Sequence, residues 1–254
     1  MLFRTVYGPE LEAIYRFIVA GQDLGRQRQD IYTAFIPKRT DEIIPSTQSV
    51  DDALAFLKSA RLIQETDGFH AYQTPPEAFA VKLLRAMRKL EIGAEQPEHH
   101  IDPLYTLLLT ELFIEPDRLF VKNLYAEANQ LRQVREAGGL TKEKVQVWKR
   151  VMEFLGIGRR AFGGFLCAYM PDLMLAIINQ WTEERGTLQS FFDYLDQVLP
   201  CARSDGELAR PVAASMLYLA EQGKIELFPL QDSPTRPYFG TLGYRWIARR
   251  HGND

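Results

Sequence analysis

The chain has 254 residues, of which 46% are hydrophobic and 25% are charged, as in an ordinary soluble globular protein. This composition excludes a disordered chain, a collagen-like repeat and a small disulfide scaffold. The formal net charge is −3, so no overall positive field favours nucleic acid as a partner. Of four consecutive stretches, only residues 141–186 are net positive, with 7 basic against 5 acidic side chains. Any contact with DNA is therefore expected to be local.

No targeting or membrane segment is predicted. The N-terminal residues lack the basic start, long apolar run and small-residue cleavage site of a signal peptide. Glycine and proline divide the apolar stretch between Arg160 and Glu183 into pieces of about ten residues, whereas a spanning helix needs roughly 20. Cys167 and Cys201 match neither a zinc-site nor a redox spacing and suit a reducing compartment. The expected location is the cytoplasm, with no membrane partner.

The N-terminal part of the chain predicts three helices followed by a β-hairpin. Helices are expected over residues 9–20, over about 24–35 and from the N-cap residue Ser49. Asp67-Gly68 is a strong hairpin turn signal between two short runs with β-favouring residues. Three helices closed by a hairpin are typical of a winged helix-turn-helix, and we predict such a module for residues 1–75.

A short internal repeat predicts a second module over residues 101–171. Phe56-Leu57 is followed by Gly-Phe, Ala-Tyr and a proline up to Pro75, and the same order follows Phe154-Leu155 up to Pro171. The helices of this module are expected over residues 102–112, over about 120–131 and from a cap at Thr141.

A third module is predicted over residues 187–254. Its expected elements are a helix over 188–199, a turn at 203–206 that opens a short helix, a helix from Pro211 to Gly223, a strand over 224–230, a wing loop over 231–237, a returning strand over 238–242 and a closing helix over 244–250. The expected fold class is mainly α with small β-hairpins (α+β): serial winged helix-turn-helix modules joined by linking helices within residues 76–100 and 172–186.

The common catalytic sequence sets are absent. The chain has no Walker A loop, no HExxH, no GxSxG and no Glu-x-Lys triplet. Gly156 to Ala161 fit the GxGxxA pattern but follow a predicted helix, so a helix stop entering a wing is favoured over a dinucleotide site. A group of acidic and histidine residues could bind a divalent metal, although a solvated linker is favoured: Glu95, Glu98, His99, His100 and Asp102. We expect no enzyme, no cofactor and no metal.

A winged helix places its third helix in the major groove and its wing over the DNA backbone. In the first module that helix begins with Asp51 and Asp52, whose carboxylates would face phosphates and argue against groove reading there. For the basic residues a solvated surface is the alternative to contact with DNA. The backbone candidates are Lys142, Lys144, Lys149, Arg150, Arg159, Arg160, Arg210 and Arg236; weaker ones are Arg26, Arg28, Lys38, Arg39, Lys58 and Arg61.

Winged modules also bind proteins through apolar grooves and wings. In its size, its near-neutral acidity and its repeated Phe-Leu…Gly-Phe…Ala-Tyr units, the chain resembles the tandem winged-helix accessory subunits of prokaryotic SMC-type complexes. It is also similar to the small third subunit of Lamassu-type antiphage systems. The resemblance implies a non-enzymatic adaptor in a DNA-processing or antiphage defence complex, with an SMC-like ATPase and other protein subunits as partners. Such accessory subunits usually have two winged domains, whereas three are predicted here.

Two other functions stay open. One is a homodimeric winged-helix transcription regulator that binds double-stranded DNA, for which the helix from Lys142 to Arg150 is the plausible base-reading element. The other is a small nucleic-acid-modifying enzyme.

Overall fold

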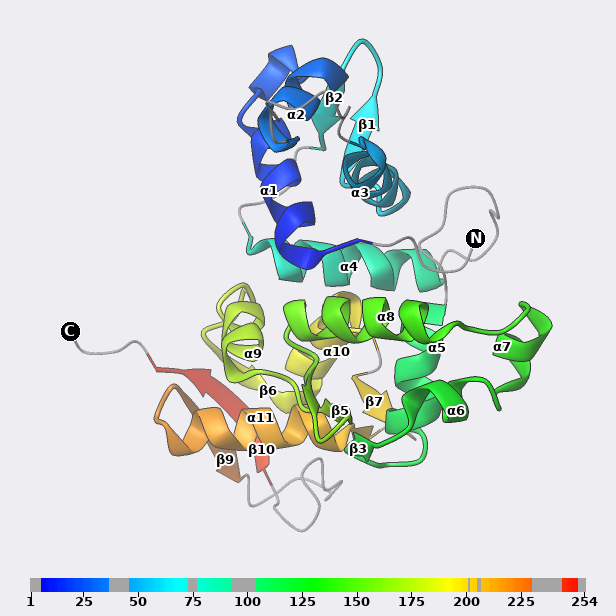
Figure 1. The fold of residues 1–254 in the computed structure, drawn as a ribbon. Helices are drawn as coiled ribbons and strands as arrows, with labels where there is room; N and C mark the ends of the chain where they lie inside the picture. Colours follow the sequence, from blue (N-terminus) through cyan, green and yellow to red (C-terminus); the bar gives the residue numbers. More distant parts are fainter. Residues whose placement is uncertain are drawn as a thin grey trace.

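The computed structural model describes residues 6–36, 46–72, 77–92, 104–200, 202–204, 207–229 and 244–250. Most of these residues are helical, and small antiparallel sheets make up the rest of the regular structure (Figure 1). The expectation of a mainly α chain with small β-structures is therefore confirmed. None of the described helices is long and apolar enough to cross a membrane.

The helices are α1 (Gly8–Val19), α2 (Arg28–Phe35), α3 (Gln48–Ser59), α4 (Phe79–Ile92), α5 (Leu104–Leu109), α6 (Leu124–Ala128), α7 (Arg132–Glu136), α8 (Lys142–Phe154), α9 (Pro171–Ile178), α10 (Leu188–Val198) and α11 (Arg210–Glu221), with a 3-10 turn η1 (Gln22–Leu24) and a π-helical turn η2 (Thr110–Ile114). The strands are β1 (Ile63–Glu65), β2 (Phe69–Ala71), β3 (Phe120–Val121), β4 (Gly158–Ala161), β5 (Gly164–Cys167), β6 (Arg185–Thr187), β7 (Arg203–Ser204), β8 (Glu207–Leu208), β9 (Ile225–Pro229) and β10 (Tyr244–Arg249).

Three groups of elements have a similar order along the chain and one sheet arrangement. We name them the N-terminal unit (α1 to β2), the middle unit (α5 to β5) and the C-terminal unit (α9 to β10). In each, the last strand lies between the strand that follows the last helix and a short strand before the second helix: β3-β5-β4 in the middle unit and β6-β10-β9 in the C-terminal unit. The middle unit has an additional helix, α7, and the C-terminal unit an additional hairpin, β7–β8. In the N-terminal unit the short strand is reduced to a single bridge between Arg26 and Phe69 of β2.

The N-terminal helices largely follow their local sequence signals. In α1, Pro9 occupies the first turn, where its missing N–H is not needed, and Leu11, Ile14 and Ile18 are buried on one face. The predicted cap of α3 is wrong by two residues, because the N-cap is Thr47. The helix begins at Gln48, whose backbone N–H donates to Ser46 Oγ at 3.2 Å, so Ser49 lies inside the first turn.

Residues 120–131, predicted as one helix, form strand β3 and helix α6 instead. Phe120 and Val121 pair with β5, and the side chain of Asn123 then accepts a hydrogen bond from the backbone N–H of Ala126 at 3.2 Å. This cap begins a new helix, α6, and α7 follows after a break. The strand pairing depends on partners more than 40 residues away, which local periodicity does not report.

Two predictions in the C-terminal unit are also wrong. The turn at 203–206 does not open a helix, because Arg203–Ser204 pairs with Glu207–Leu208 in a short hairpin. Residues 244–249, predicted as a closing helix, form strand β10, which pairs with β6 on one side and β9 on the other. Tyr244, Trp246 and Ile247 favour extended backbone once both neighbouring strands are present. The predicted wing loop at 231–237 and the strand at 238–242 lie outside the described residues.

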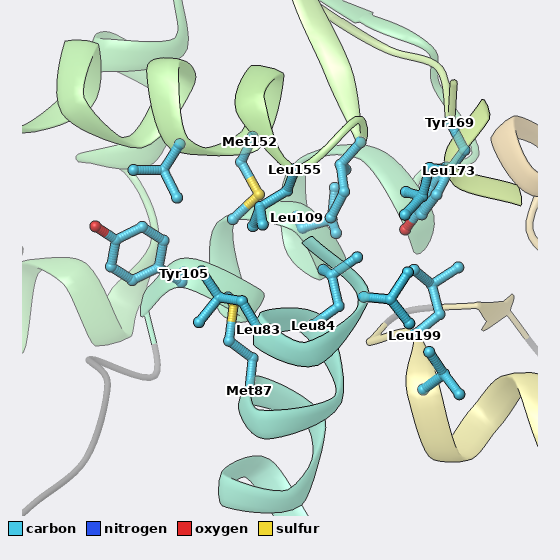
Figure 2. Close-up of a cluster of buried hydrophobic side chains, with 14 of the residues drawn as sticks. Leu83, Leu84, Met87, Tyr105, Leu109, Met152, Leu155, Tyr169, Leu173 and Leu199 are labelled. Carbon is cyan, nitrogen blue, oxygen red and sulfur yellow. The ribbon is translucent and has the colours of Figure 1, made fainter. Parts of the chain in front are cut away.

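Helix α4 lies between the N-terminal unit and the other two units (Figure 1). Its side chains Leu83, Leu84 and Met87 are buried in a cluster with residues of α5, α8 and α9 and with Leu199 after α10 (Figure 2). Each fully buried apolar side chain of this kind contributes roughly 1.5–3 kcal/mol. The segment expected as a linking helix thus supplies central core residues. Helix α9 packs against α11 and β6 pairs with β10, so residues 171–187 belong to the C-terminal unit.

Candidate nucleic-acid interface

Helix α8 was expected to carry the main DNA contacts, but it is covered on two sides. It begins as predicted, with Thr141 Oγ1 accepting from the backbone N–H of Lys144 at 3.3 Å. Trp148 is fully buried in the core of the middle unit and donates from its indole nitrogen to the carbonyl oxygen of Tyr105 at 3.0 Å. A second face is turned to α1 and α4, where the ring of Phe154 lies 6.1 Å from that of Phe79.

Lys149 of α8 is also buried. Its exposed fraction is 4%, and no carboxylate among the described residues pairs with its ammonium group. Burial lowers the pKa of Lys149, and the positive charge of Arg160 lowers it further. The side chain cannot reach a phosphate without leaving the fold. Lys149 is therefore removed from the candidate contacts.

The exposed strip of α8 keeps three basic side chains. Lys142 is exposed with its ammonium 5.9 Å from the ring of Tyr125, and Arg150 is exposed with its guanidinium 5.5 Å from the ring of Tyr7. Lys144 is half-buried. Within the part of the chain that the structure describes, none of these three forms an ion pair, so their charges are available to an anion.

The β4–β5 hairpin carries the two arginines predicted for the wing, in different surroundings. Arg159 is exposed and has no carboxylate partner among the described residues. Arg160 forms an ion pair with Glu153 of α8 at 2.6 Å, and its backbone N–H donates to the same carboxylate at 3.2 Å. The glutamate thus neutralises the guanidinium of Arg160 and also accepts a hydrogen bond from its backbone N–H, which faces outward on the free edge of β4. Of the pair, Arg159 is the better phosphate contact.

In the N-terminal unit, ion pairs occupy two of the weaker candidates. Arg28 bonds Asp51 at 2.7 Å and Glu65 at 2.8 Å, and Lys58 bonds Glu65 at 2.6 Å. The hydrogen bond from Lys58, followed by that from Arg28, holds the pKa of Glu65 below its ordinary value. Asp51 also accepts from Tyr32 Oη at 2.6 Å. These cations join α2, α3 and β1 rather than facing solvent alone.

The remaining weaker candidates differ from one another. Arg26 donates from Nε to the carbonyl oxygen of Phe17 at 3.3 Å and stacks on that ring, with 4.6 Å to its centroid. Arg61 is exposed and forms no ion pair among the described residues. Lys38 and Arg39 lie outside the described residues.

In the C-terminal unit, Arg210 at the start of α11 serves as a contact between units. It donates to Asp117 Oδ1 at 3.1 Å and to the carbonyl oxygen of the same residue, which follows η2 in the middle unit. Arg236 lies outside the described residues, as does the whole group from Glu95 to Asp102. Within the described residues, no three His, Cys, Asp or Glu side chains gather into a set that could hold a metal ion.

The structure adds one surface residue that sequence reasoning did not single out. Phe162, at the tip of the β4–β5 hairpin, is 90% exposed, and its ring lies edge-on to that of Phe120 with 6.4 Å between centroids. The local signal was present, because Phe162-Gly163 stands between two β-forming runs of the predicted wing. The exposure of its ring depends on the two-residue turn that Phe162 and Gly163 form, which local periodicity does not report.

Comparison of the chain with models of protein families, with curated proteins and with solved structures finds no match. The inference of function therefore depends on the geometry described above.

Proposed function

We propose that this chain is a non-enzymatic adaptor made of three winged-helix units in series. It would act as a subunit of a DNA-associated complex, of the SMC-like or antiphage defence kind, that binds partner proteins and contacts the DNA backbone through a few basic side chains. The winged-helix assignment is supported by a similarity of each unit to the order helix, short strand, helix, helix, strand, strand, with the last strand central. The N-terminal unit has a single bridge in place of the short strand, the middle unit has α6 and α7 in place of the second helix, and the C-terminal unit contains the additional hairpin β7–β8. On this assignment α9 and β6 begin the third winged unit, and α4 connects the first two.

The observation that carries the proposal is the burial of two helices in the third, groove-reading position. A helix that reads the major groove needs one whole face free to enter it. In α3, Phe56 is buried with its ring 6.1 Å from that of Tyr105 in the middle unit. In α8, the ring of Phe154 lies against Gly8 of the N-terminal unit and faces Phe79 of α4. These faces join units to one another, which favours an adaptor over a transcription regulator.

Helix α11, in the same position of the C-terminal unit, offers few charges to a phosphate. Its exposed residues include Arg210, Ala214, Tyr218 and Glu221. The arginine is bonded to Asp117, and the glutamate would repel a backbone. This helix face suits a protein surface better than DNA.

Of the backbone candidates predicted in and near α8, four have no carboxylate partner among the described residues: Lys142, Lys144, Arg150 and Arg159. Each phosphate that is neutralised contributes about −0.9 to the slope of log affinity against log salt, so four contacts give a slope no steeper than about −3.6. Binding of a random duplex should be measured from about 50 to 300 mM salt. Absence of binding at the lowest salt would remove DNA from the proposal.

Light scattering during gel filtration separates the adaptor from the regulator. The adaptor should run alone as a monomer near 29.2 kDa and enter a larger complex of defined stoichiometry when purified from its own cells. A stable homodimer that protects a specific sequence in footprinting would favour the regulator instead.

A further inference from the structure

The tip of the β4–β5 hairpin is built at a cost to the fold. Ala161 pairs with Gly164, leaving Phe162 and Gly163 as a two-residue turn with φ of 49° and 76°. A turn with positive φ at both central residues favours Asn-Gly, because most side chains are strained in the left-handed region. Phe162 combines this strain with a ring that is 90% exposed to water. Neither feature helps folding, which points to a role in binding.

The surroundings of Phe162 are aromatic and basic. The register places Phe120, Leu166 and Arg159 across the outer face of the sheet, opposite the buried Phe165, and Phe120 is itself 37% exposed. The backbone of Lys122 lies beside Gly164, and its side chain is exposed. Neither Arg159 nor Lys122 forms an ion pair among the described residues.

The charge of the hairpin favours an anionic ligand. Residues 154–171 contain two arginines and no carboxylate. The nearest glutamate, Glu153, is bonded to Arg160 and to the outer edge of β4, so addition of a partner strand at that edge is disfavoured. An exposed aromatic ring flanked by free cations matches the base faces and phosphates of a nucleic acid.

We propose that Phe162 is a base-stacking residue and that the hairpin tip binds nucleic acid with accessible base faces, above all single-stranded DNA. Arg159 and Lys122 would contact the phosphates on either side of the stacked base. Single strands are favoured over intact duplex because the bases of a duplex already stack on one another. The ring would first have to separate two neighbouring base pairs before it could stack. The inference rests on the DNA-binding part of the proposed function and specifies its ligand and its contact.

The test compares variants of the full chain in fluorescence anisotropy, with a labelled random single strand and the duplex of the same sequence. Phe162→Asn gives the turn a residue that it prefers, so the melting temperature should stay or rise. Affinity for the single strand should fall roughly 5- to 150-fold, the range measured for loss of one base–aromatic stack, with a smaller change for the duplex. Phe162→Trp should retain binding.

A matched control removes an exposed apolar side chain elsewhere. Leu24 of η1 is 91% exposed in the N-terminal unit, and Leu24→Ala should leave both affinities unchanged. If Phe162→Asn binds the single strand as well as the natural chain does, base stacking is refuted while the backbone contacts of the proposed function stand. If the natural chain binds neither DNA, the DNA part of the proposed function fails as well, and the tip is better explained as an anchor for a protein.

Discussion

Gly8, at the start of α1, lies directly against the ring of Phe154 at the end of α8. A Cβ atom added at Gly8 would overlap Cβ, Cγ and Cδ1 of the phenylalanine, atoms close to the backbone of a partly buried side chain. The contact joins the N-terminal and middle units, and the ring of Phe79 of α4 lies 6.1 Å from the same ring. The two units therefore meet with no space for a methyl group.

Gly8→Ala should destabilise the protein by about 1–3 kcal/mol, because overpacking at this contact must push α1 away from α8. Urea unfolding followed by circular dichroism measures the change. Phe154→Ala on its own should also destabilise, but in the double variant the two costs should be less than additive, since this change removes Cγ and Cδ1, two of the three atoms that the added methyl group would overlap. Strict additivity would contradict a direct contact.

Local sequence signals predicted those elements whose causes are local. The Thr141 cap, the first turn at Pro9 and the hairpin turn at Asp67-Gly68 each depend on neighbours within a few residues, and each lies where expected. The strand at 244–249 was missed because its partners, β6 and β9, are determined by the assembled unit. Hydrophobic periodicity could not report them.

The same dependence on the assembled fold explains why the candidate site was predicted only in part. The sequence predicts Lys149 as a DNA-backbone candidate, with a solvated surface as the alternative, because the pattern of its own helix does not show that the side chain is buried. Asp51 is expected from the sequence only as a carboxylate at the start of a helix, whereas in the fold it bonds Arg28 from α2. The presence of cations was predictable from sequence, but their pairing was not.

Lys149→Met should stabilise the protein at neutral pH by roughly 1–3 kcal/mol, because an unpaired buried amine is replaced by an apolar chain of similar length. The pKa of Lys149 is lowered in the fold below its ordinary value of 10.5, so between these two values the unfolded state binds the extra proton. In this pH range the free energy of unfolding of the natural chain therefore rises with pH. The difference in free energy of unfolding between the natural chain and the more stable variant should shrink as pH approaches 10.5.

Thermal melts from neutral to alkaline pH measure this difference. Affinity for duplex DNA should be the same in Lys149→Met and the natural chain. A clear loss of DNA binding in a stable variant would show that Lys149 leaves the interior to meet a phosphate.

Glu65→Gln should lower the free energy of unfolding at neutral pH but not at acidic pH, where the natural carboxylate is protonated. The pKa of Glu65 is held below its ordinary value of 4.5 by hydrogen bonds from Lys58 and Arg28, so the contribution is complete above 4.5 and is lost as pH falls through the lowered pKa. Because the carboxylate is partly exposed, the loss at neutral pH should be about 1 kcal/mol or less. The urea midpoints of the two proteins should therefore differ at neutral pH and converge at acidic pH.

Glu136→Gln is the matched control for that carboxylate. Glu136 pairs with Arg132 on the surface of α7, with both side chains largely exposed, so its removal should change stability by a few tenths of a kcal/mol at most. Equal effects of the two substitutions at neutral pH would contradict a special role for the pairs that join α2, α3 and β1.

Arg159→Ala and Arg160→Ala provide a matched test of the charges in the hairpin, because each removes one positive charge from adjacent positions of β4. Arg159 has no carboxylate partner among the described residues, so its loss should make the salt dependence of duplex binding shallower by about 0.9. Arg160 is bonded to Glu153, and its loss should change the slope less while lowering stability, since it frees a carboxylate beside the β4 edge. Equal changes in slope for both variants would mean that DNA responds only to net charge. A larger change for Arg160→Ala would mean that the pair with Glu153 opens when DNA binds.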